Sequence, residues 1–240
     1  MKVSANPLDW LILDSVESTQ SIASEIVTTA DRSTVPIVMT LNQTKGRGRF
    51  ERSWYSEPGA SLTFSWIAWD FPNHPQPWLI GMAMAVAAAG AVHAKLQWPN
   101  DLMLEDRKLG GILTEVATSI SGNAIAVVGL GINLKSQDFP VDLRARAISL
   151  EDHRPGNYEA DQVAIDVIDR LNLLPDPDQW HTLEQAWRLF DVTPGKRYSL
   201  PNGEEALAIG IGPEGELLCS VDGEARSVLA AEALIRPTGL

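Results

Sequence analysis

The chain has 240 residues, of which 45% are hydrophobic and 21% charged, a composition typical of a globular protein with a sizeable core. Its net charge of -12 and its sequence pI near 4.7 argue against general binding of nucleic acids or anionic membranes, because the overall field repels polyanions. The single cysteine, Cys219, excludes an intrachain disulfide and a cysteine-rich metal site.

The N-terminus and the longest apolar run indicate a soluble protein. The first residues, MKVSANPLDWLIL, lack the basic start, apolar run and small-residue cleavage site of a signal peptide. Residues 78–94 are mostly small and fall short of the ~20 positions of a membrane span, so they predict a buried helix. We therefore expect a cytoplasmic protein, which the lone cysteine also fits.

The segments before that helix show a helix pattern and two strand patterns. Residues 18–30 carry apolar side chains at the i, i+4 spacing of a helix packed on one face, with Ser18 or Thr19 as its N-cap. The β-branched run 35–41 and the alternating run 60–69 predict two strands. A long polar loop lies between these two strands.

The segments after the buried helix predict more strands and then two helices. Two strands flank a turn at Trp98–Asp101, and the apolar run 124–134 predicts a central strand. Gly129 and Gly131 interrupt that run, so another group must approach the backbone closely there. Residues 161–174 and 180–190 then predict amphipathic helices.

The C-terminal segment has a different residue pattern from the rest of the chain. Turn signals at 202–203, 213–215 and 222–223 separate short alternating runs. Regularly spaced short strands with hairpin turns predict a small barrel of about fifty residues.

The polar loop, residues 43–59, is cationic in an acidic chain. From Lys45 to Arg52 it carries four basic residues and one acidic residue. Glycines alternate with Arg47 and Arg49, which allows backbone amides and guanidinium groups to converge on phosphate oxygens. A solvated surface loop is the alternative; an RGG-like nucleic-acid tract is disfavoured by the acidic chain.

A second group of polar residues follows Trp98. Pro99 fixes an extended or turn conformation, which places Asn100 and Asp101 at a corner between a strand and a turn. Lys108 precedes paired glycines at the head of an apolar strand, where an anion can contact both its amine and the backbone. The alternatives are an Asx turn that serves only the backbone and an ordinary lysine at a strand end.

Two common sites are not supported by the sequence. The GLGIN motif at 129–133 is an incomplete dinucleotide fingerprint, because Leu134 stands where the third glycine belongs, and no Walker A lysine motif is present. The four histidines are scattered without the spacing of zinc ligands.

Five blocks in this order closely resemble biotin protein ligases, also called biotin–[acetyl-CoA-carboxylase] ligases. The blocks are residues 18–20, 43–62, 98–101, 106–113 and 129–133. The resemblance implies an α+β fold, a mixed β-sheet flanked by helices that is shared with lipoate ligases, followed by a small SH3-like β-barrel. We accordingly expect a catalytic domain over 1–190 and a barrel domain over 191–240.

The resemblance implies a ligase with a two-step reaction. The biotin carboxylate attacks the α-phosphate of ATP, which gives biotinyl-5′-AMP and pyrophosphate, and a lysine of a biotin carboxyl carrier protein then attacks the mixed anhydride. Biotin and ATP are the implied substrates, and Mg²⁺ is held mainly through the ATP phosphates without a direct protein ligand. The implied partner is the carrier subunit of acetyl-CoA carboxylase, with no nucleic acid or membrane, and the protein is expected as a monomer or homodimer.

The resemblance also assigns roles to residues. The catalytic residues are Lys108, Arg47, Arg49 and Asp101. The biotin site is Ser18, Thr19, Gln20, Gln43, Gly46, Arg47, Lys108, Gly111, Gly129 and Gly131. The adenylate site is Arg47, Gly48, Arg49, Arg52, Trp54, Asn100, Lys108 and Asn133. Lys108 bridges the carboxylate and the α-phosphate, Trp54 stacks on adenine, Asn133 bonds near the base or ribose, and Asp101 positions or deprotonates the acceptor amine.

Three positions depart from the family pattern. Gln20 stands in place of a common Asn, Gln97 in place of Lys or Arg, and Phe50-Glu51 in place of small or basic residues. The cationic residues of the loop and Lys108 are retained, so we expect an active enzyme. The alternatives are a lipoate or octanoate ligase of the same superfamily and a catalytically inactive biotin-binding protein. Some relatives in the family carry an N-terminal helix-turn-helix that represses biotin genes; this sequence has no counterpart, so we expect no role in transcription.

Overall fold

The computed structural model describes residues 2–30, 35–200, 202–229 and 236–237. Its main feature is a seven-stranded sheet in the order β1-β2-β5-β9-β8-β7-β6. The strands are β1 (Leu11–Leu13), β2 (Ile37–Thr40), β5 (Ser61–Ile67), β6 (Lys95–Gln97), β7 (Asp101–Leu104), β8 (Arg107–Thr118) and β9 (Ala124–Asn133). Only β1 and β2 pair in parallel. The predicted mixed sheet is therefore confirmed.

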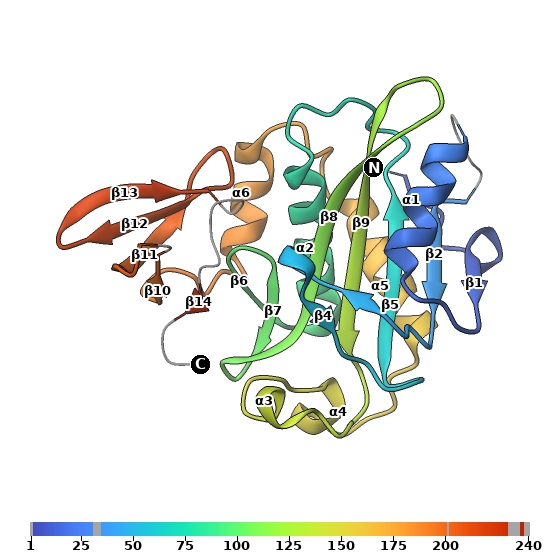
Figure 1. Ribbon diagram of the computed structural model, residues 1–240, viewed down its shortest axis with the longest axis horizontal. Helices are drawn as coiled ribbons and strands as arrows, with labels where there is room; N and C mark the ends of the chain where they lie inside the picture. The colour runs from blue at the N-terminus through green and yellow to red at the C-terminus, as the bar shows by residue number, and fades with distance from the viewer. Residues whose placement is uncertain (1, 31–34, 201, 230–235, 238–240) are drawn as a thin grey trace.

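Helices cover both faces of the sheet (Figure 1). On one face, α1 (Thr19–Thr29) buries Ala23 and Val27 against Val38 and Ile67. On the other face lie α2 (Trp78–Val92) and α5 (Ala160–Leu173), which share the main core with Phe64 of β5. The alternation of β5 explains this division, because successive side chains of a strand point to opposite faces.

The remaining helices are short and lie around this layered core. They are η1 (Pro7–Asp9), α3 (Val141–Arg144), α4 (Leu150–His153) and α6 (Trp180–Arg188). Helix α2 is buried on nearly all sides, as its apolar sequence predicted. In the described part of the chain, no helix combines the length and apolar character that a membrane crossing requires.

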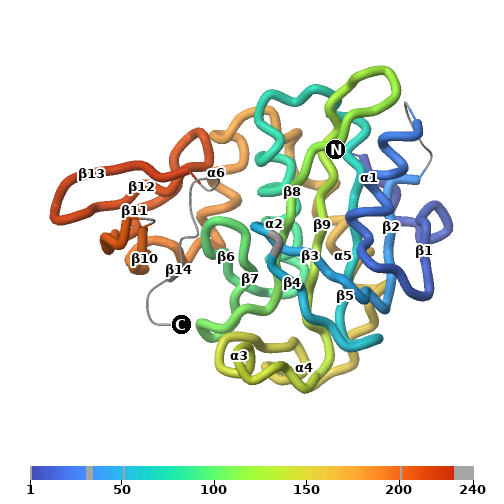
Figure 2. Tube along the Cα trace, viewed as in Figure 1, coloured from blue at the N-terminus to red at the C-terminus, as the bar shows by residue number. Residues whose placement is uncertain are grey.

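The cationic loop forms a hairpin on the α1 face of the sheet. Its strands are β3 (Gly46–Arg47) and β4 (Ser53–Trp54), joined through η2 (Arg49–Glu51). Figure 2 shows this hairpin in front of β8 and β9. Phe50, at its tip, has φ 55°, a left-handed conformation that is strained for a bulky side chain.

The C-terminal segment forms a five-stranded antiparallel sheet in the order β13-β12-β11-β10-β14. Its strands are β10 (Arg197–Ser199), β11 (Glu205–Ile211), β12 (Leu217–Val221), β13 (Glu224–Val228) and β14 (Arg236–Pro237). The predicted β-rich C-terminal unit is thus present, with positive φ at Asp222 and Gly223 as a tight hairpin turn requires. Among the described residues, β13 and β14 are the outer strands of this sheet, and its closure into the predicted barrel stays a prediction.

Trp98 joins the C-terminal sheet to the main sheet. Its backbone N–H donates to Thr193 Oγ1 at 2.8 Å, and its indole N–H donates to the Gly215 carbonyl at 2.9 Å. Tyr198 Oη donates to the Trp98 carbonyl at 3.1 Å. The division between 1–190 and 191–240 stays a prediction, since the hydrophobic core continues across it.

Candidate active site

A cavity of about 760 Å³ opens on the α1 face of the sheet. It is bounded by the first turn of α1, the β3–β4 hairpin, strands β5, β7, β8 and β9, and the segment 139–147. The predicted site residues that line it are Ser18, Thr19, Gln20, Gln43, Arg47, Gly48, Arg49, Arg52, Trp54, Asn100, Asp101, Lys108, Gly111, Gly129, Gly131 and Asn133. Segments far apart in the sequence therefore meet around one cavity.

Gly46 is the one predicted residue outside that lining. A Cβ at this position would lie 2.6 Å from the Trp54 carbonyl oxygen and 2.8 Å from Gln43 Nε2. The glycine therefore permits Gln43 and β4 to pack closely behind the wall of the cavity.

Small residues form the floor of the cavity. In the sheet register, Gly131 lies between Thr63 and Gly111 on its neighbouring strands. A Cβ on Gly129 would lie 2.8 Å from Gln20 Oε1, and one on Gly131 would lie 2.7 Å from Trp54 Cε2. The close approach predicted at these two glycines is present, and the approaching groups are the Gln20 amide and the Trp54 ring.

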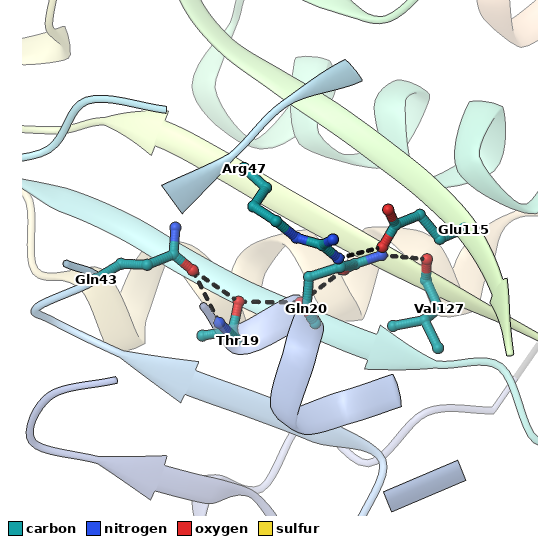
Figure 3. Close-up of polar contacts among 7 residues, drawn as sticks. Thr19, Gln20, Gln43, Arg47, Glu115 and Val127 are labelled. Atoms are coloured by element: carbon teal, nitrogen blue, oxygen red, sulfur yellow. Dashed lines mark hydrogen bonds and ion pairs between the residues drawn. The ribbon is translucent and has the colours of Figure 1, made fainter. Parts of the chain in front are cut away.

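One end of the cavity is polar and buried (Figure 3). The Thr19 backbone N–H donates to Gln43 Oε1 at 2.9 Å, and Thr19 Oγ1 lies 3.0 Å from Ser65 Oγ. Gln20 spans from α1 to β9, where its Nε2 donates to the Val127 carbonyl at 2.9 Å. Ser18 Oγ is buried and has no hydrogen-bond partner among the described residues. This end can therefore hydrogen-bond a buried polar ligand group.

Arg47 lies beside this polar end. Its Nη2 bonds Glu115 Oε2 at 2.6 Å, next to the contact between Gln20 and Val127, and so ties the hairpin to β8 (Figure 3).

The other end of the cavity is cationic and is lined by Arg49, Arg52 and Lys108. Burial lowers the pKa of Arg49, Asp101 opposes that shift, and the positive charge of Arg52 adds to it. The Arg49 guanidinium lies 4.8 Å from the centroid of the Phe50 ring. An anion that enters here relieves the repulsion between neighbouring guanidinium groups.

Lys108 lies at the same end. Its Nζ donates to Asp101 Oδ1 at 2.5 Å, and both side chains remain partly exposed. The backbone of Lys108 is fixed by bonds to the Arg146 carbonyl at 2.6 Å and from the Ile148 N–H at 3.0 Å. Asn100 Nδ2 donates to the Ile112 carbonyl. The fixed backbone leaves the lysine side chain free to turn from Asp101 towards a bound anion.

Trp54 and Asn133 differ in their availability to a ligand. Trp54 Nε1 is buried without a hydrogen-bond partner among the described residues. The Asn133 amide is already engaged, because its Nδ2 donates to the Ile148 carbonyl at 3.1 Å and its Oδ1 accepts from Gln137 at 3.2 Å. Asn133 thus braces the segment that follows β9, and its predicted contact with the base or ribose stays a prediction.

Sequence reasoning missed three residues at the site. Ser65 lies in the floor, Glu115 bonds Arg47, and Arg146 lines the cationic end. The alternation of β5 places Ser65 on the same face as Thr63, but only the register with Gly129 shows that this face meets the cavity. Among the described residues, no group of three or more His, Cys, Asp or Glu side chains forms a metal site.

The model of the biotin/lipoate A/B protein ligase family matches residues 12–133. The chain is 34% identical over 146 residues to the bifunctional ligase/repressor BirA of Bacillus spizizenii. This alignment covers 57% of this chain and 44% of that protein. It is 28% identical over 247 residues to the biotin–[acetyl-CoA-carboxylase] ligase of Mycobacterium tuberculosis. That alignment covers 94% of this chain and 89% of the relative. The chain thus spans less than half the length of the first relative.

A solved structure shares the fold. The biotin protein ligase from Aquifex aeolicus in complex with biotin and ATP superposes with a TM-score of 0.74, at 20% identity, over 96% of this chain and 99% of the other. The likeness covers both the main sheet and the C-terminal unit.

Proposed function

This chain belongs to the biotin/lipoate A/B protein ligase family, and from that membership we propose that it activates biotin with ATP as biotinyl-5′-AMP and transfers biotin to a lysine of a carrier protein. The names of the matched relatives support this reaction, and the name of the mycobacterial relative supports acetyl-CoA carboxylase as the source of the carrier.

One observation carries the proposal: a single cavity joins a buried hydrogen-bonding end to a cationic end. Biotin has a polar ureido ring at one end and a carboxylate at the other. Ser18, Thr19 and Gln43 suit the ureido ring, whereas Lys108 and Arg49 suit the carboxylate and the phosphates. The glycines of β9 leave room for the apolar part of biotin between these ends.

The first step brings two anions together, so positive charge must offset their repulsion and stabilise the charge that develops at phosphorus. Lys108 is the group that contacts both the biotin carboxylate and the α-phosphate. Arg47, Arg49 and Arg52 close over the phosphates, and Trp54 stacks on adenine. Mg²⁺, when bound with ATP, would offset part of the triphosphate charge, and the cationic lining at Arg49, Arg52 and Lys108 fits phosphates that themselves hold the ion.

The second step needs a deprotonated lysine amine and little water, because the mixed anhydride hydrolyses. Asp101 holds Lys108 by a hydrogen bond. When Lys108 turns to the anion, the Asp101 carboxylate becomes available to orient the acceptor amine and accept its proton. The hairpin covers the adenylate until the carrier arrives.

Incubation of the protein with labelled biotin, MgATP and a carrier domain tests the function. We expect pyrophosphate release and label on a single carrier lysine. Lys108→Gln should abolish both, while Lys95→Gln, which alters an exposed lysine away from the cavity, should leave both intact. Heat of binding with lipoate and none with biotin would contradict the proposal.

A further inference from the structure

Two segments of the chain leave the same end of the main sheet side by side. Ser61 of β5 and Asn133 of β9 are partners in the antiparallel register, so the residues just before Ser61 and just after Asn133 extend beyond one end of the sheet. Glu57 and Gln137 each lie four residues beyond this pair. Helices α3 and α4 lie at the same end (Figure 1). The fold thus brings the chain that follows the hairpin against the segment that leads into α3.

Glu57 joins these two segments by hydrogen bonds. Its backbone N–H donates to Gln137 Oε1 at 3.0 Å, and its carboxylate Oε1 accepts from the Asp138 backbone N–H at 3.1 Å. The same carboxylate oxygen accepts from Tyr55 Oη at 3.2 Å. Tyr55 Oη also lies 3.1 Å from the Asp138 carbonyl oxygen, but its single proton serves one acceptor at a time. The contacts of Glu57 with Gln137 and Asp138 are called the Glu57 link below.

The Glu57 link lies outside the cavity but joins two of its walls. Its three residues are not part of the cavity lining, whereas Trp54 and Tyr55 on one side and Phe139 on the other side are. The rings of Tyr55 and Phe139 lie 6.3 Å apart between centroids. Any effect of the link on a ligand must therefore pass through the position of these walls.

The wall that follows Phe139 is braced internally and reaches the backbone of Lys108. Arg144 Nε donates to the Phe139 carbonyl at 2.9 Å, and Arg144 Nη2 bonds Asp138 Oδ1 at 2.7 Å. Further along, the Arg146 carbonyl accepts the Lys108 N–H at 2.6 Å. Both Arg146 and Lys108 line the cavity. This wall is thus held at one end by the Glu57 link and at the other end by Lys108.

We propose that Glu57 is a positioning residue for the nucleotide: it sets the distance between the wall that carries Trp54 and the segment 139–147, and so the affinity of the cationic end for ATP. The inference rests on the proposed function, which places ATP at this end. Biotin should be affected little, because the hydrogen bond between Thr19 and Gln43 at the polar end does not pass through the Glu57 link.

Steady-state kinetics of pyrophosphate release in the presence of the carrier domain tests the inference, with ATP and biotin varied in turn. Glu57→Met removes the acceptor oxygen and leaves the Asp138 N–H without this partner. We expect the KM for ATP to rise about tenfold, because ATP must then order a segment that the link held in place. The KM for biotin should stay within about twofold of the wild-type value.

Glu57→Gln separates hydrogen bonding from charge. Both side-chain contacts of Glu57 use one oxygen, Oε1, and the amide oxygen of glutamine can take the same place. This variant should therefore keep the KM for ATP within about twofold of the wild-type value. A rise as large as that of Glu57→Met would mean that the charge of Glu57 acts rather than the link, and would overturn the inference.

Hydrogen exchange measured by mass spectrometry follows the wall directly. Exchange in the segment 139–147 should be faster in Glu57→Met than in the wild type and unchanged in Glu57→Gln. The matched control is Asn123→Ala, which removes a hydrogen bond of 2.7 Å from Asn73, between the loops at the opposite end of β5 and β9. This control should change neither the exchange of the segment nor either KM.

The outcomes separate the two proposals. A wild type that releases no pyrophosphate with biotin contradicts the proposed function. An active wild type overturns the inference and keeps the function if Glu57→Met leaves the KM for ATP unchanged or raises both KM values equally. Circular dichroism checks the fold, and Glu57→Ala repeats the test should Glu57→Met not fold. Loss of the fold in both variants would show that Glu57 serves the fold rather than the nucleotide, which also overturns the inference.

Discussion

Arg47 reaches across from the hairpin to Glu115 of β8, with 2.6 Å between Nη2 and Oε2, and so fastens the loop to the sheet. The two side chains are 45% and 36% exposed, which places the pair in the class of surface ion pairs worth about 0–1 kcal/mol. A contact of this strength can hold the loop closed and still release it for substrate entry.

Replacement of Glu115 by Gln should therefore change the loop more than the fold. We expect the free energy of unfolding to fall by less than ~1 kcal/mol and trypsin to cleave faster within residues 45–52, the cationic segment. High salt should reduce the difference from wild type, because salt screens exposed charges. The exposed Glu25→Gln on α1 is the control; equal cleavage rates in all three proteins would show that the pair does not restrain the loop.

Arg49→Gly should loosen retention of the adenylate. Removal of one charge-assisted contact to a phosphate corresponds to a rise of about tenfold in the rate of adenylate loss. We expect biotin to label lysines of an unrelated protein as well as the carrier. Mass spectrometry of a mixture of the two proteins measures this labelling. Arg154→Gly, which does not line the cavity, serves as the control. Label confined to the carrier in Arg49→Gly would mean that this arginine does not hold the intermediate.

Gly131→Ala should disturb the packing of the Trp54 ring against β9. Its Cβ would lie 2.7 Å from Trp54 Cε2, so either the ring or β4 must move. We expect a loss of about 1–3 kcal/mol in the free energy of unfolding, typical of an overpacked site, and a larger loss of ATP affinity than of biotin affinity. Gly210→Ala in β11 meets no atom within 4 Å and is the matched control. Unchanged ATP binding in Gly131→Ala would show that Trp54 does not contact the adenylate.

Asp191 carries a pH-dependent contribution to stability. Burial raises its pKa, against the opposing hydrogen bonds from Thr193. The folded protein then keeps the proton at pH values where the unfolded chain has released it, so stability falls as the pH rises through this window. At neutral pH the buried carboxylate is destabilising, by ~1.4 kcal/mol for each pKa unit of elevation.

Asp191→Asn should raise the Tm at pH 7, because the amide oxygen can still accept the Thr193 N–H that Asp191 accepts at 2.9 Å. The gain should vanish below about pH 4, the unfolded pKa of an aspartate, where the wild-type side chain is also neutral. The exposed Asp169→Asn on α5 is the control. A gain that is equal at both pH values would contradict the role of ionisation.

The sequence predicted those parts of the fold that depend on local pattern. The buried helix expected over 78–94 is α2, Trp78–Val92, and the strand expected over 124–134 is β9. The short strand β1 and the pairing of β3 with β4 were not predicted, because strands of two or three residues have too few positions to show alternation.

The site was predictable where a residue type implies a chemistry and not where it depends on register. Arg49 and Lys108 stand out from their neighbours in the sequence, and both line the cavity. Ser65 is one small polar residue among several in an alternating strand, and its role follows only from its position opposite Gly129. Similarly, no local signal indicates that Glu115 lies opposite Arg47, since 68 residues separate them.

Trp98 has a consequence for any shortened form of the protein. Its backbone N–H donates to Thr193, and its indole N–H donates to the Gly215 carbonyl. Its carbonyl accepts from Tyr198. A chain cut after α6 would leave these three groups of Trp98 without their partners and would expose more of its indole ring. Trp98 lies two residues before Asn100, so the change would be close to the cavity. The C-terminal sheet thus supports the corner that carries Asn100 and Asp101, and a chain shortened by this sheet should lose the shape of the cavity at that corner.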